Sequence, residues 1–303
     1  MPPCVIGLEA CTGAHHWARA LRAHGHDARI IAPRFVIPYR KSGKNDGNDA
    51  EAICEAVSRP AMRFVPVKST EQQASLCLHR IRQGIVAERT AQINQIRGLL
   101  SEFGLIMPKG RYPAQRHIPD ILEDADNGLP ALVRRLLNDV WQRILQLNQQ
   151  ILDYDREVES LARQSDPAQN LMSIPGIGAI TATALVASTG DTKQFRSGRQ
   201  FSAWLGLTPR QYSTGGRTRL GRITKQGDKY LRTLLIHGAR AVLATLKDKQ
   251  DRISCWLREL IGRRGYKRAT VALAAKNARI IWVLLTRNES YKLQSTKTAV
   301  ASY

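Results

Sequence analysis

Apolar residues recur at alternating spacings of three and four through residues 137–161. They are Leu137, Val140, Ile144, Leu147, Ile151, Tyr154, Val158 and Leu161. This repeat places one apolar stripe along a helix and is typical of coiled-coil packing. Residues 70–103 also show a helical pattern and contain no proline. The stripe pairs either with that helix of the same chain or with a second copy, and the sequence leaves both pairings open.

The first residues of the chain alternate between strand-like and helix-like patterns. Residues 4–8 form an apolar strand that ends at Glu9, residues 15–24 a helix closed by Gly25, and residues 28–32 a second strand. This order predicts a parallel sheet covered by helices. The first strand has the composition of a central strand, and the segment is too short for a complete domain. We therefore expect a partial α/β domain whose sheet lacks strands.

The remainder is predicted to be mainly helical. A helix is expected over residues 49–57, a short extended piece over 63–67, and a loop over 108–119, which is rich in proline, glycine and cations. Further helices are expected over 179–186, 230–246, 253–261 and 269–285. We expect four parts: a partial α/β domain at 1–68, long helices or a coiled coil at 69–165, a helical domain at 166–287, and a disordered tail at 288–303.

The chain is strongly basic, with a formal net charge of +21 and an isoelectric point near 10.3. This balance points to a polyanionic partner, most often nucleic acid. No apolar run approaches the ~20 residues of a membrane span. The five cysteines (Cys4, Cys11, Cys54, Cys77 and Cys255) are odd in number and lack paired metal-ligand spacing. They predict reduced thiols in a cytoplasmic protein.

A dense run of cations over residues 211–229 surrounds two adjacent hydroxyls, Ser213 and Thr214. Gly215 and Gly216 permit a tight turn and the close approach of a ligand. The cations that can hold phosphates are Arg217, Arg219, Arg222, Lys225 and Lys229. A hydroxyl held against an anionic backbone is what phosphoryl transfer through a serine ester requires. The alternative is a solvated basic loop that only touches DNA.

Three acids in the N-terminal part are candidate metal ligands. Asp46 and Asp49 are three residues apart, so a helix that begins at Asp46 places both on one face. Glu9 ends a strand, and sites in open parallel sheets gather at the carboxyl ends of strands. Converging carboxylates bind Mg²⁺, and two ions about 4 Å apart stabilise phosphodiester displacement. The alternatives are a helix N-cap for Asp46 and a first-turn acid for Asp49.

The segment Pro175-Gly176-Ile177-Gly178 reads as the turn of a helix-hairpin-helix. Its glycines, Gly176 and Gly178, expose backbone N–H groups at a helix N-terminus, where a DNA phosphate can dock. The alternative is an ordinary tight turn between helices.

For several other polar residues, the sequence indicates surface or packing roles, or leaves the role open. A surface or packing role is predicted for His15 and His16, which lack a third ligand at metal spacing. A solvated helix face is predicted for Glu51 and Glu55. A long helix that could run along nucleic acid carries His79, Arg80 and Arg82.

Four motifs occur in an order that resembles a known family. They are residues 8–17 (LEACTGAHHW), residues 44–50 (KNDGNDA), the Pro-Gly-Ile-Gly turn, and the Ser-Thr-Gly-Gly loop. The chain resembles the DEDD-type insertion-sequence transposases related to the Piv invertase, over nearly its whole length. The resemblance implies a RuvC-like, RNase H-fold domain joined to a coiled coil and a serine-bearing helical transposase domain.

The resemblance also implies roles for particular residues. Glu9, Asp46 and Asp49 match the last three acids of the family's Asp-Glu-Asp-Asp site for Mg²⁺. Ser213 matches the nucleophile, in preference to Thr214, because the family's loop reads Ser, then Ser or Thr, then Gly-Gly. The serine would attack a DNA phosphate, and the freed 3′-hydroxyl would attack a second strand. The implied partners are double-stranded DNA, a non-coding guide RNA and further copies of the chain, in the cytoplasm of a bacterium at the nucleoid.

One departure from the family's pattern concerns its first Asp. None of the eight residues before Glu9 is acidic, so three acids of four are present. We expect a chain truncated at its N-terminus that recombines weakly or not at all. Two other functions remain open: a non-catalytic DNA- or RNA-binding remnant that competes with a full-length enzyme, and a metal-dependent nuclease in which Ser213 only contacts phosphate.

Overall fold

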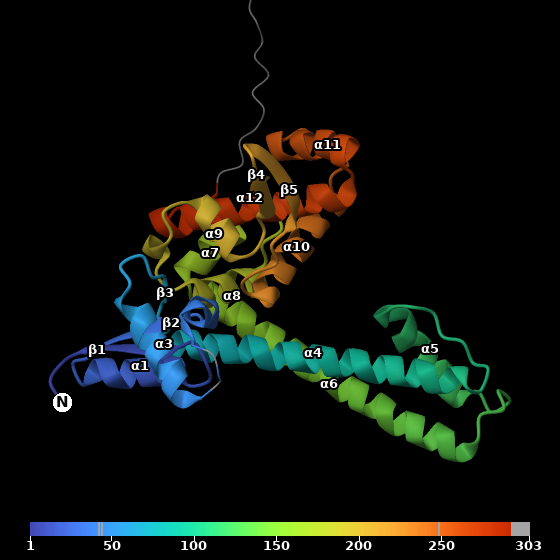
Figure 1. The fold of residues 1–303 in the computed structure, drawn as a ribbon. Coiled ribbons are helices and arrows are strands. Elements are labelled where there is room, and N and C mark those ends of the chain that lie inside the picture. Colours follow the sequence, from blue (N-terminus) through green and yellow to red (C-terminus); the bar gives the residue numbers. More distant parts are fainter. Residues whose placement is uncertain (42, 44, 248, 292–303) are drawn as a thin grey trace, which may run out of the picture. The chain divides into compact units, whose positions relative to one another are not determined.

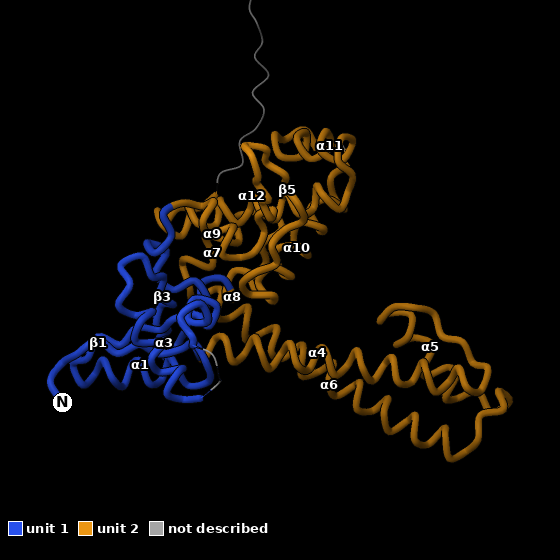
Figure 2. Tube along the Cα trace, viewed as in Figure 1, with its two compact units in different colours: residues 1–73, 185–196 blue, residues 74–184, 197–303 orange. Residues whose placement is uncertain are grey.

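The computed structural model of the protein describes residues 1–41, 43, 45–247 and 249–291 (Figure 1). These residues form two compact units (Figure 2). Unit 1 comprises residues 1–73 and 185–196, and unit 2 comprises the described residues of 74–184 and 197–303. The predicted division at residues 68, 165 and 287 stays a prediction. The predicted disordered tail lies outside the described residues from position 292 onward.

Unit 1 contains a sheet with the strand order β1-β2-β3. The strand β1 (Val5–Glu9) pairs in parallel with β2 (Asp27–Ile31), and the helix α1 (Ala14–Ala23) connects them. The short strand β3 (Phe64–Val65) pairs antiparallel with β2. The predicted βαβ order is therefore confirmed. The sequence suggested that the first strand is central, whereas among the described residues β2 is the central strand.

A helix covers each face of this sheet. Ile30 packs with Ala14 and Ala18 of α1, whereas its neighbour Ile31 packs with Ala52 of α3 (Asp46–Ser58). Successive residues of a strand point to opposite faces, so α1 and α3 lie on different sides. Between β2 and α3 the chain forms the short helices α2 (Pro33–Val36) and η1 (Ile37–Tyr39). The sheet therefore positions β1 and α3, which carry the candidate carboxylates.

Unit 2 contains a hairpin of two long helices, α4 (Thr70–Ser101) and α6 (Ala131–Arg163) (Figure 1). Their shared apolar core includes Ile93 and Ile96 of α4 with Leu137 and Ile144 of α6. Polar contacts join the same two helices, among them Arg143 with Glu88, Arg82 with Asp155, and Arg89 with Asn148. The packing partner of the heptad stripe is thus the helix of the same chain. Pairing with a second copy stays a prediction.

The predicted loop over residues 108–119 is wrong, because the helix α5 (Arg111–Glu123) occupies most of it. Pro113 lies in the first turn of α5, where no helical N–H bond is lost. The second proline, Pro119, lies inside the helix. Ala114 and Ile118 are buried in the same core as the long helices. This burial outweighs the local cost of the prolines.

The rest of unit 2 is a helical domain around α12 (Tyr266–Arg287). The other elements here are α7 (Asp166–Met172), α9 (Gly198–Trp204), α10 (Lys229–Ala244), α11 (Arg252–Arg264) and the first half of α8 (Ala179–Thr189). The second half of α8 and the short helix η2 (Thr192–Gln194) belong to unit 1. The helix α12 packs against α7, α9, α10 and α11 and buries Leu273, Ala278 and Ile281 completely or nearly so.

This central helix also revises the prediction about apolar runs. Among the described residues, α12 is long and apolar enough to cross a membrane by length and composition. Its many buried residues are those of a core helix, which passes the same test. We therefore read α12 as the core of the helical domain.

A two-stranded ribbon interrupts the helices of unit 2, where the sequence predicted only helix and loop. It consists of β4 (Pro209–Thr214) and β5 (Arg217–Ile223), paired antiparallel. The ribbon is missing from the prediction because its residues are mostly polar or basic and show no apolar alternation.

Candidate functional site

The hydroxyl pair and the glycine pair lie at the tip of the β4–β5 ribbon. Gly215 and Gly216 form a two-residue connection between the paired residues Thr214 and Arg217. Both glycines have positive φ angles, 55° and 77°, as a hairpin turn of this length requires. Nothing lies within 4 Å of where a Cβ would be at either position. Their role in the structure is therefore to make the turn.

Ser213 is exposed near this turn and stands opposite Thr218 in the neighbouring strand. The side-chain amide of Gln211 donates a hydrogen bond of 2.8 Å to the Ser213 hydroxyl oxygen. Because the oxygen accepts from Gln211, its own proton is left free for another acceptor. In the described part of the chain, the structure places no imidazole or carboxylate in hydrogen-bond contact with this hydroxyl. The geometry offers an accessible nucleophile without a general base in place.

The cations predicted for phosphate contact all lie in or beside this ribbon. Arg217, Arg219 and Arg222 are exposed on β5, Lys225 follows it, and Lys229 begins α10. No Asp or Glu occurs between Asp191 and Asp228 in the sequence. A concentration of positive charge without acids is an electrostatic footprint for a polyanion.

The base of the ribbon is held by close backbone packing. A Cβ on Gly206 would lie 2.7 Å from the backbone nitrogen of Gln226, and Gly206 has a φ angle of 70°. The Lys225 amide donates to the Gly206 carbonyl at 3.1 Å. The nearly buried Arg232 of α10 donates to the carbonyls of Leu205 and Gln226 at 3.2 and 3.1 Å. One guanidinium thus bridges the two chain segments that enter and leave the ribbon.

The candidate carboxylates lie in unit 1. Helix α3 begins at Asp46, so Asp46 and Asp49 share its first turn, as predicted for a helix that starts there. The N-cap is Asn45, whose side chain accepts from the amide of Asn48 at 2.7 Å, so the alternative of Asp46 as N-cap is wrong. Glu9 is half-buried at the end of β1.

These acids do not form a metal centre as they stand. Oδ1 of Asp49 lies 2.7 Å from Nε of Arg40, and both side chains are about one-quarter exposed. Within residues 1–41, 43, 45–247 and 249–291, no group of three His, Cys, Asp or Glu side chains is arranged to hold a metal ion. The guanidinium therefore supplies the positive charge beside Asp49.

The predicted turn between α7 and α8 is present, and one of its glycines has a packing role. Gly176 has a φ angle of 86°, and a Cβ there would lie 2.6 Å from the carbonyl oxygen of Gly238 in α10. The side chains of Ile174 and Ile177 are buried. By contrast, Gly178 is exposed and has open space around it. Contact with α10 explains Gly176, and a phosphate contact at Gly178 stays a prediction.

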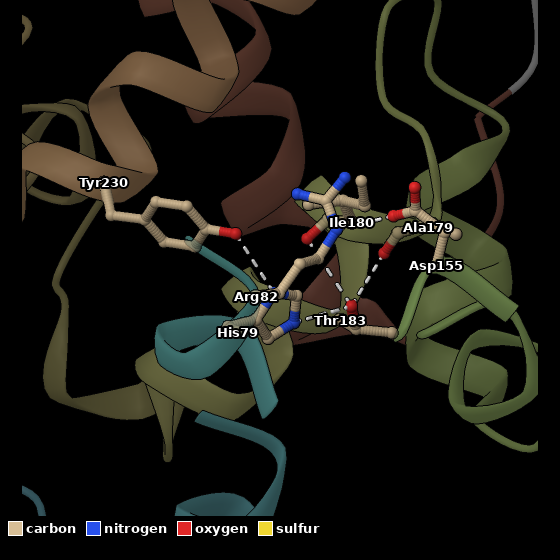
Figure 3. A network of polar contacts seen from close by, with 7 residues as sticks. All are labelled: His79, Arg82, Asp155, Ala179, Ile180, Thr183 and Tyr230. Atoms are coloured by element: carbon tan, nitrogen blue, oxygen red, sulfur yellow. Dashed lines mark hydrogen bonds and ion pairs between the residues drawn. The ribbon is translucent and has the colours of Figure 1, made fainter. Parts of the chain in front are cut away.

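A buried polar network joins α4, α8 and α10 within unit 2 (Figure 3). His79 is 1% exposed, and its Nε2 lies 3.0 Å from the Thr183 hydroxyl. Its Nδ1 lies 3.2 Å from the Tyr230 hydroxyl. Thr183 donates its own proton to the Ala179 carbonyl at 2.7 Å, so Nε2 of His79 must be the donor to Thr183. The neutral imidazole then accepts from Tyr230 at Nδ1.

Burial and the nearby charge of Arg82 lower the pKa of His79 to about 4. Arg82 itself pairs with Asp155 at 2.5 Å. The side chains of His79 and Arg82 are therefore engaged inside the protein, whereas the expectation that this helix runs along nucleic acid stays a prediction. Arg80, on the same helix, is exposed.

The packing and surface roles predicted for His15, Glu51 and Glu55 agree with the structure. His15 contacts Lys68, whose backbone amide lies 3.3 Å from His15 Nδ1, which is a packing role. Glu51 and Glu55 are exposed and pair with Lys41 and Arg59. All five cysteines are free, as predicted.

Known proteins resemble the chain in both parts of the candidate site. Residues 168–253 match the family described as Transposase IS116/IS110/IS902, and residues 2–104 match the DEDD transposase domain of IS110 elements. A probable family 20 transposase of Pseudomonas aeruginosa is 51% identical over 293 residues, which is 96% of this chain and 87% of that protein. A transposase for insertion sequence element IS1111A of Coxiella burnetii is 49% identical, over 95% of this chain and 79% of that protein. The chain belongs to the IS110/IS116 transposase family.

Membership of this transposase family implies, in general terms, an enzyme that cleaves and recombines DNA, with DNA as its partner. The two matched ranges divide the candidate residues. Glu9, Asp46 and Asp49 fall in the DEDD domain, a type that is typically metal-dependent, and Ser213 falls in the second range.

Sequence reasoning missed two residues that position this transposase's ribbon. Gln211 holds the Ser213 hydroxyl, and Arg232 holds the base of the ribbon. A signal for the ribbon existed, because two glycines between Thr and Arg in a run of β-branched and polar residues are typical of a two-residue hairpin. Nothing in the sequence distinguished Arg232 from the many other cations.

Proposed function

We propose that the chain is an insertion-sequence transposase that cuts and rejoins DNA through a covalent bond to Ser213. The observation that carries this proposal is an exposed serine at the tip of an exposed, acid-free, arginine-rich ribbon. Such a ribbon attracts a polyanion, and its tip can reach a phosphodiester that a buried hydroxyl could not.

The chemistry balances in two displacements. The Ser213 oxygen forms a bond to phosphorus, the bond from phosphorus to the 3′-oxygen breaks, and that oxygen leaves with a proton as a 3′-hydroxyl. A 3′-hydroxyl from another strand then attacks the phosphoserine, and the serine recovers its proton. Gln211 donates a hydrogen bond to the serine oxygen and so orients it without removing its proton.

A divalent metal enters the proposal only as a binding hypothesis. Glu9, Asp46 and Asp49 are hard oxygen donors of the kind that Mg²⁺ prefers. Their present arrangement does not fit a metal ion, because Arg40 pairs with Asp49. No chemical step is therefore derived through a metal, and Asp49 becomes available as a ligand only when Arg40 leaves it.

Titration calorimetry with Mg²⁺ tests this competition. Arg40→Gln should bind Mg²⁺ more tightly than the native chain, because a competing cation is removed. Asp49→Asn should bind it more weakly, and Glu51→Gln, on the exposed side of the same helix, should bind it like the native chain. Equal affinity in all four proteins would show that Asp49 is not a ligand.

The family resemblance adds two partners to the proposal, a guide RNA and further copies of the chain. The net charge of +21 supports the binding of more than one nucleic acid. The long α4–α6 hairpin leaves apolar side chains such as Leu132 and Leu152 exposed, which supports contact with a second copy. Sedimentation with and without RNA measures both.

The covalent step has a direct test. The chain is incubated with Mg²⁺, donor-end DNA and total cellular RNA, and a protein–DNA adduct is sought on a denaturing gel. We expect an adduct with the native chain and with Thr214→Ala, and none with Ser213→Ala. An adduct that persists in Ser213→Ala refutes the serine mechanism.

A second function has one observation in its favour. In the described part of the chain, the three acids are not arranged to hold a metal ion, as expected for a DNA- or RNA-binding protein without catalysis. DNA binding with no adduct under any condition would favour this function over the first.

A further inference from the structure

The pairing register of the β4–β5 ribbon sorts its side chains onto two faces. Ser213 stands opposite Thr218, and Gln211 stands opposite Leu220, so these four side chains lie on one face. The hydrogen bond from Gln211 to Ser213 agrees with this placement, since residues two apart in a strand share a face. None of the four side chains is charged.

The other face has a different composition. Tyr212 stands opposite Arg219, and Thr214 stands opposite Arg217. The register shifts between Pro209 and Gln211, but Arg210 still lies on their face, because a Cβ on Gly221 would be 3.4 Å from the Tyr212 ring and 3.9 Å from Arg210 Cβ. All five side chains are exposed. In the part of the chain that the structure describes, none of the three arginines forms an ion pair.

We propose that the arginine face of the ribbon binds the backbone of duplex DNA while Ser213 acts from the opposite face. This inference rests on the proposed function and deepens it, because it separates two roles that the sequence assigns to one loop. The phosphate that Ser213 attacks is then a different phosphate from those that Arg210, Arg217 and Arg219 hold.

Charge and shape both favour duplex DNA as the occupant of the arginine face. Three like charges on one small exposed face repel each other, and an external anion relieves that repulsion. Arginine forks bind phosphate oxygens bidentately. A two-stranded antiparallel ribbon is of a size that the major groove of B-DNA admits. Single-strand binding would instead favour a series of aromatic side chains, and this face offers only Tyr212.

The ribbon's surroundings support a ligand on this face. Residues 209–222 are all exposed, and isolated two-stranded hairpins are marginal in water. The base of the ribbon is fixed by Arg232 and the Gly206 contact, whereas in the described chain no helix or loop packs over its two strands. A bound duplex would supply the missing contacts.

The first test measures how DNA affinity depends on salt. A fluorescein-labelled duplex oligonucleotide is titrated with the native chain and with a triple variant, Arg210→Ala, Arg217→Ala and Arg219→Ala, between 50 and 200 mM KCl. Loss of three phosphate contacts should reduce the slope of log affinity against log salt by about 2.7. Over this fourfold rise in salt, the native chain should lose about 40 times more affinity than the variant.

A matched control removes the same charge elsewhere. Arg135, Arg156 and Arg163 are exposed on α6, and their triple alanine variant changes the net charge equally. This control should keep the native slope. An equal change of slope in both triple variants, or no change in the ribbon variant, overturns the proposal. A change seen only with a hairpin RNA of equal length also overturns it in favour of RNA.

The second test separates the two faces. At low salt and saturating protein, the adduct formed per bound duplex should be unchanged in the ribbon triple variant, because its arginines do not hold the attacked phosphate. Gln211→Ala should keep the salt slope but lower the adduct per bound duplex. A large loss of adduct per bound duplex in the arginine variant would show that one phosphate serves both faces and would refute the separation.

The outcomes also distinguish this inference from the proposed function. A native salt slope that depends on the arginines, with no adduct from any protein, leaves the DNA-binding face standing and removes the serine chemistry. A Ser213-dependent adduct with a slope that is independent of the arginines leaves the serine chemistry standing and removes the DNA-binding role of the arginine face.

Discussion

His79 should make the stability of unit 2 depend on pH in a predictable direction. In the folded chain, burial first and the charge of Arg82 second lower its pKa from 6.5 to about 4. In the unfolded chain, its pKa returns to about 6.5. Between these values the unfolded state binds a proton that the native state refuses, so stability falls as pH decreases. The difference of about 2.5 pKa units corresponds to about 3 kcal/mol, nearly all of it lost by pH 4.

The geometry explains why the native state refuses the proton. Nε2 already donates to Thr183, and Nδ1 accepts from Tyr230 in the neutral state. A proton on Nδ1 would bury a charge away from water and put a second positive charge near Arg82. The side chain is 1% exposed, so water cannot stabilise the charge.

Hydrogen exchange provides the assay, because it reports on the helices joined by His79 rather than on the whole chain. Amide protection in α8 and α10 is measured between pH 7 and pH 4 for the native chain and for His79→Gln, after correction for intrinsic exchange. Gln preserves a donor and an acceptor but does not titrate. Protection in the native chain should fall toward pH 4 by about 3 kcal/mol more than in His79→Gln. Parallel curves for the two proteins would refute the assignment to His79.

Three further perturbations follow from the contacts described above. Gly176→Ala should destabilise unit 2 by about 2 kcal/mol or more in urea unfolding, since its Cβ would lie 2.6 Å from the Gly238 carbonyl, whereas Gly178→Ala, with open space, should change little. Arg82→Ala should cost about 1–2 kcal/mol by the same measurement, because its pair with Asp155 is partly buried. Arg156→Ala, which breaks an exposed pair, should fall within about 0.5 kcal/mol of the native chain. The Arg82→Ala change should also raise the pKa of His79, seen by NMR titration, and an unchanged pKa would contradict the role given to that charge.

The sequence predicted those parts of the fold where an apolar pattern meets a matching partner. The βαβ order at the N-terminus is recognisable because Gly25 closes the first helix and Pro33 stops a short strand that contains Ile30 and Ile31. The stripe on α6 predicted a packed helix, and its members Leu137, Ile144 and Leu147 are buried, but the choice of α4 as the partner came only from the structure. In both cases burial is local in the sequence pattern, and the chain folds accordingly.

The parts that sequence reasoning missed depend on contacts with distant residues. Helix α5 contains two prolines and reads as a loop, but Ile118 is buried against the long helices. The burial of His79 depends on Thr183 and Tyr230, which are 104 and 151 residues away in the sequence. Likewise, the sequence predicts Asp49 as a metal ligand, whereas in the structure its carboxylate pairs with Arg40. Residue type and spacing carry no information about such partners.

The contacts of Gly206 and Arg232 at the base of the β4–β5 ribbon determine how far its tip can move. Strands of six or seven residues span about 20 Å, so a rotation of about 10° at Gly206 would displace Ser213 by about 3 Å. Reacting atoms must be placed far more finely than that. A ribbon that is held only at its base cannot by itself fix the position of Ser213 precisely. In the proposed serine mechanism, the final alignment of the hydroxyl would therefore be set by what the two strands contact, and bound DNA would itself complete the site.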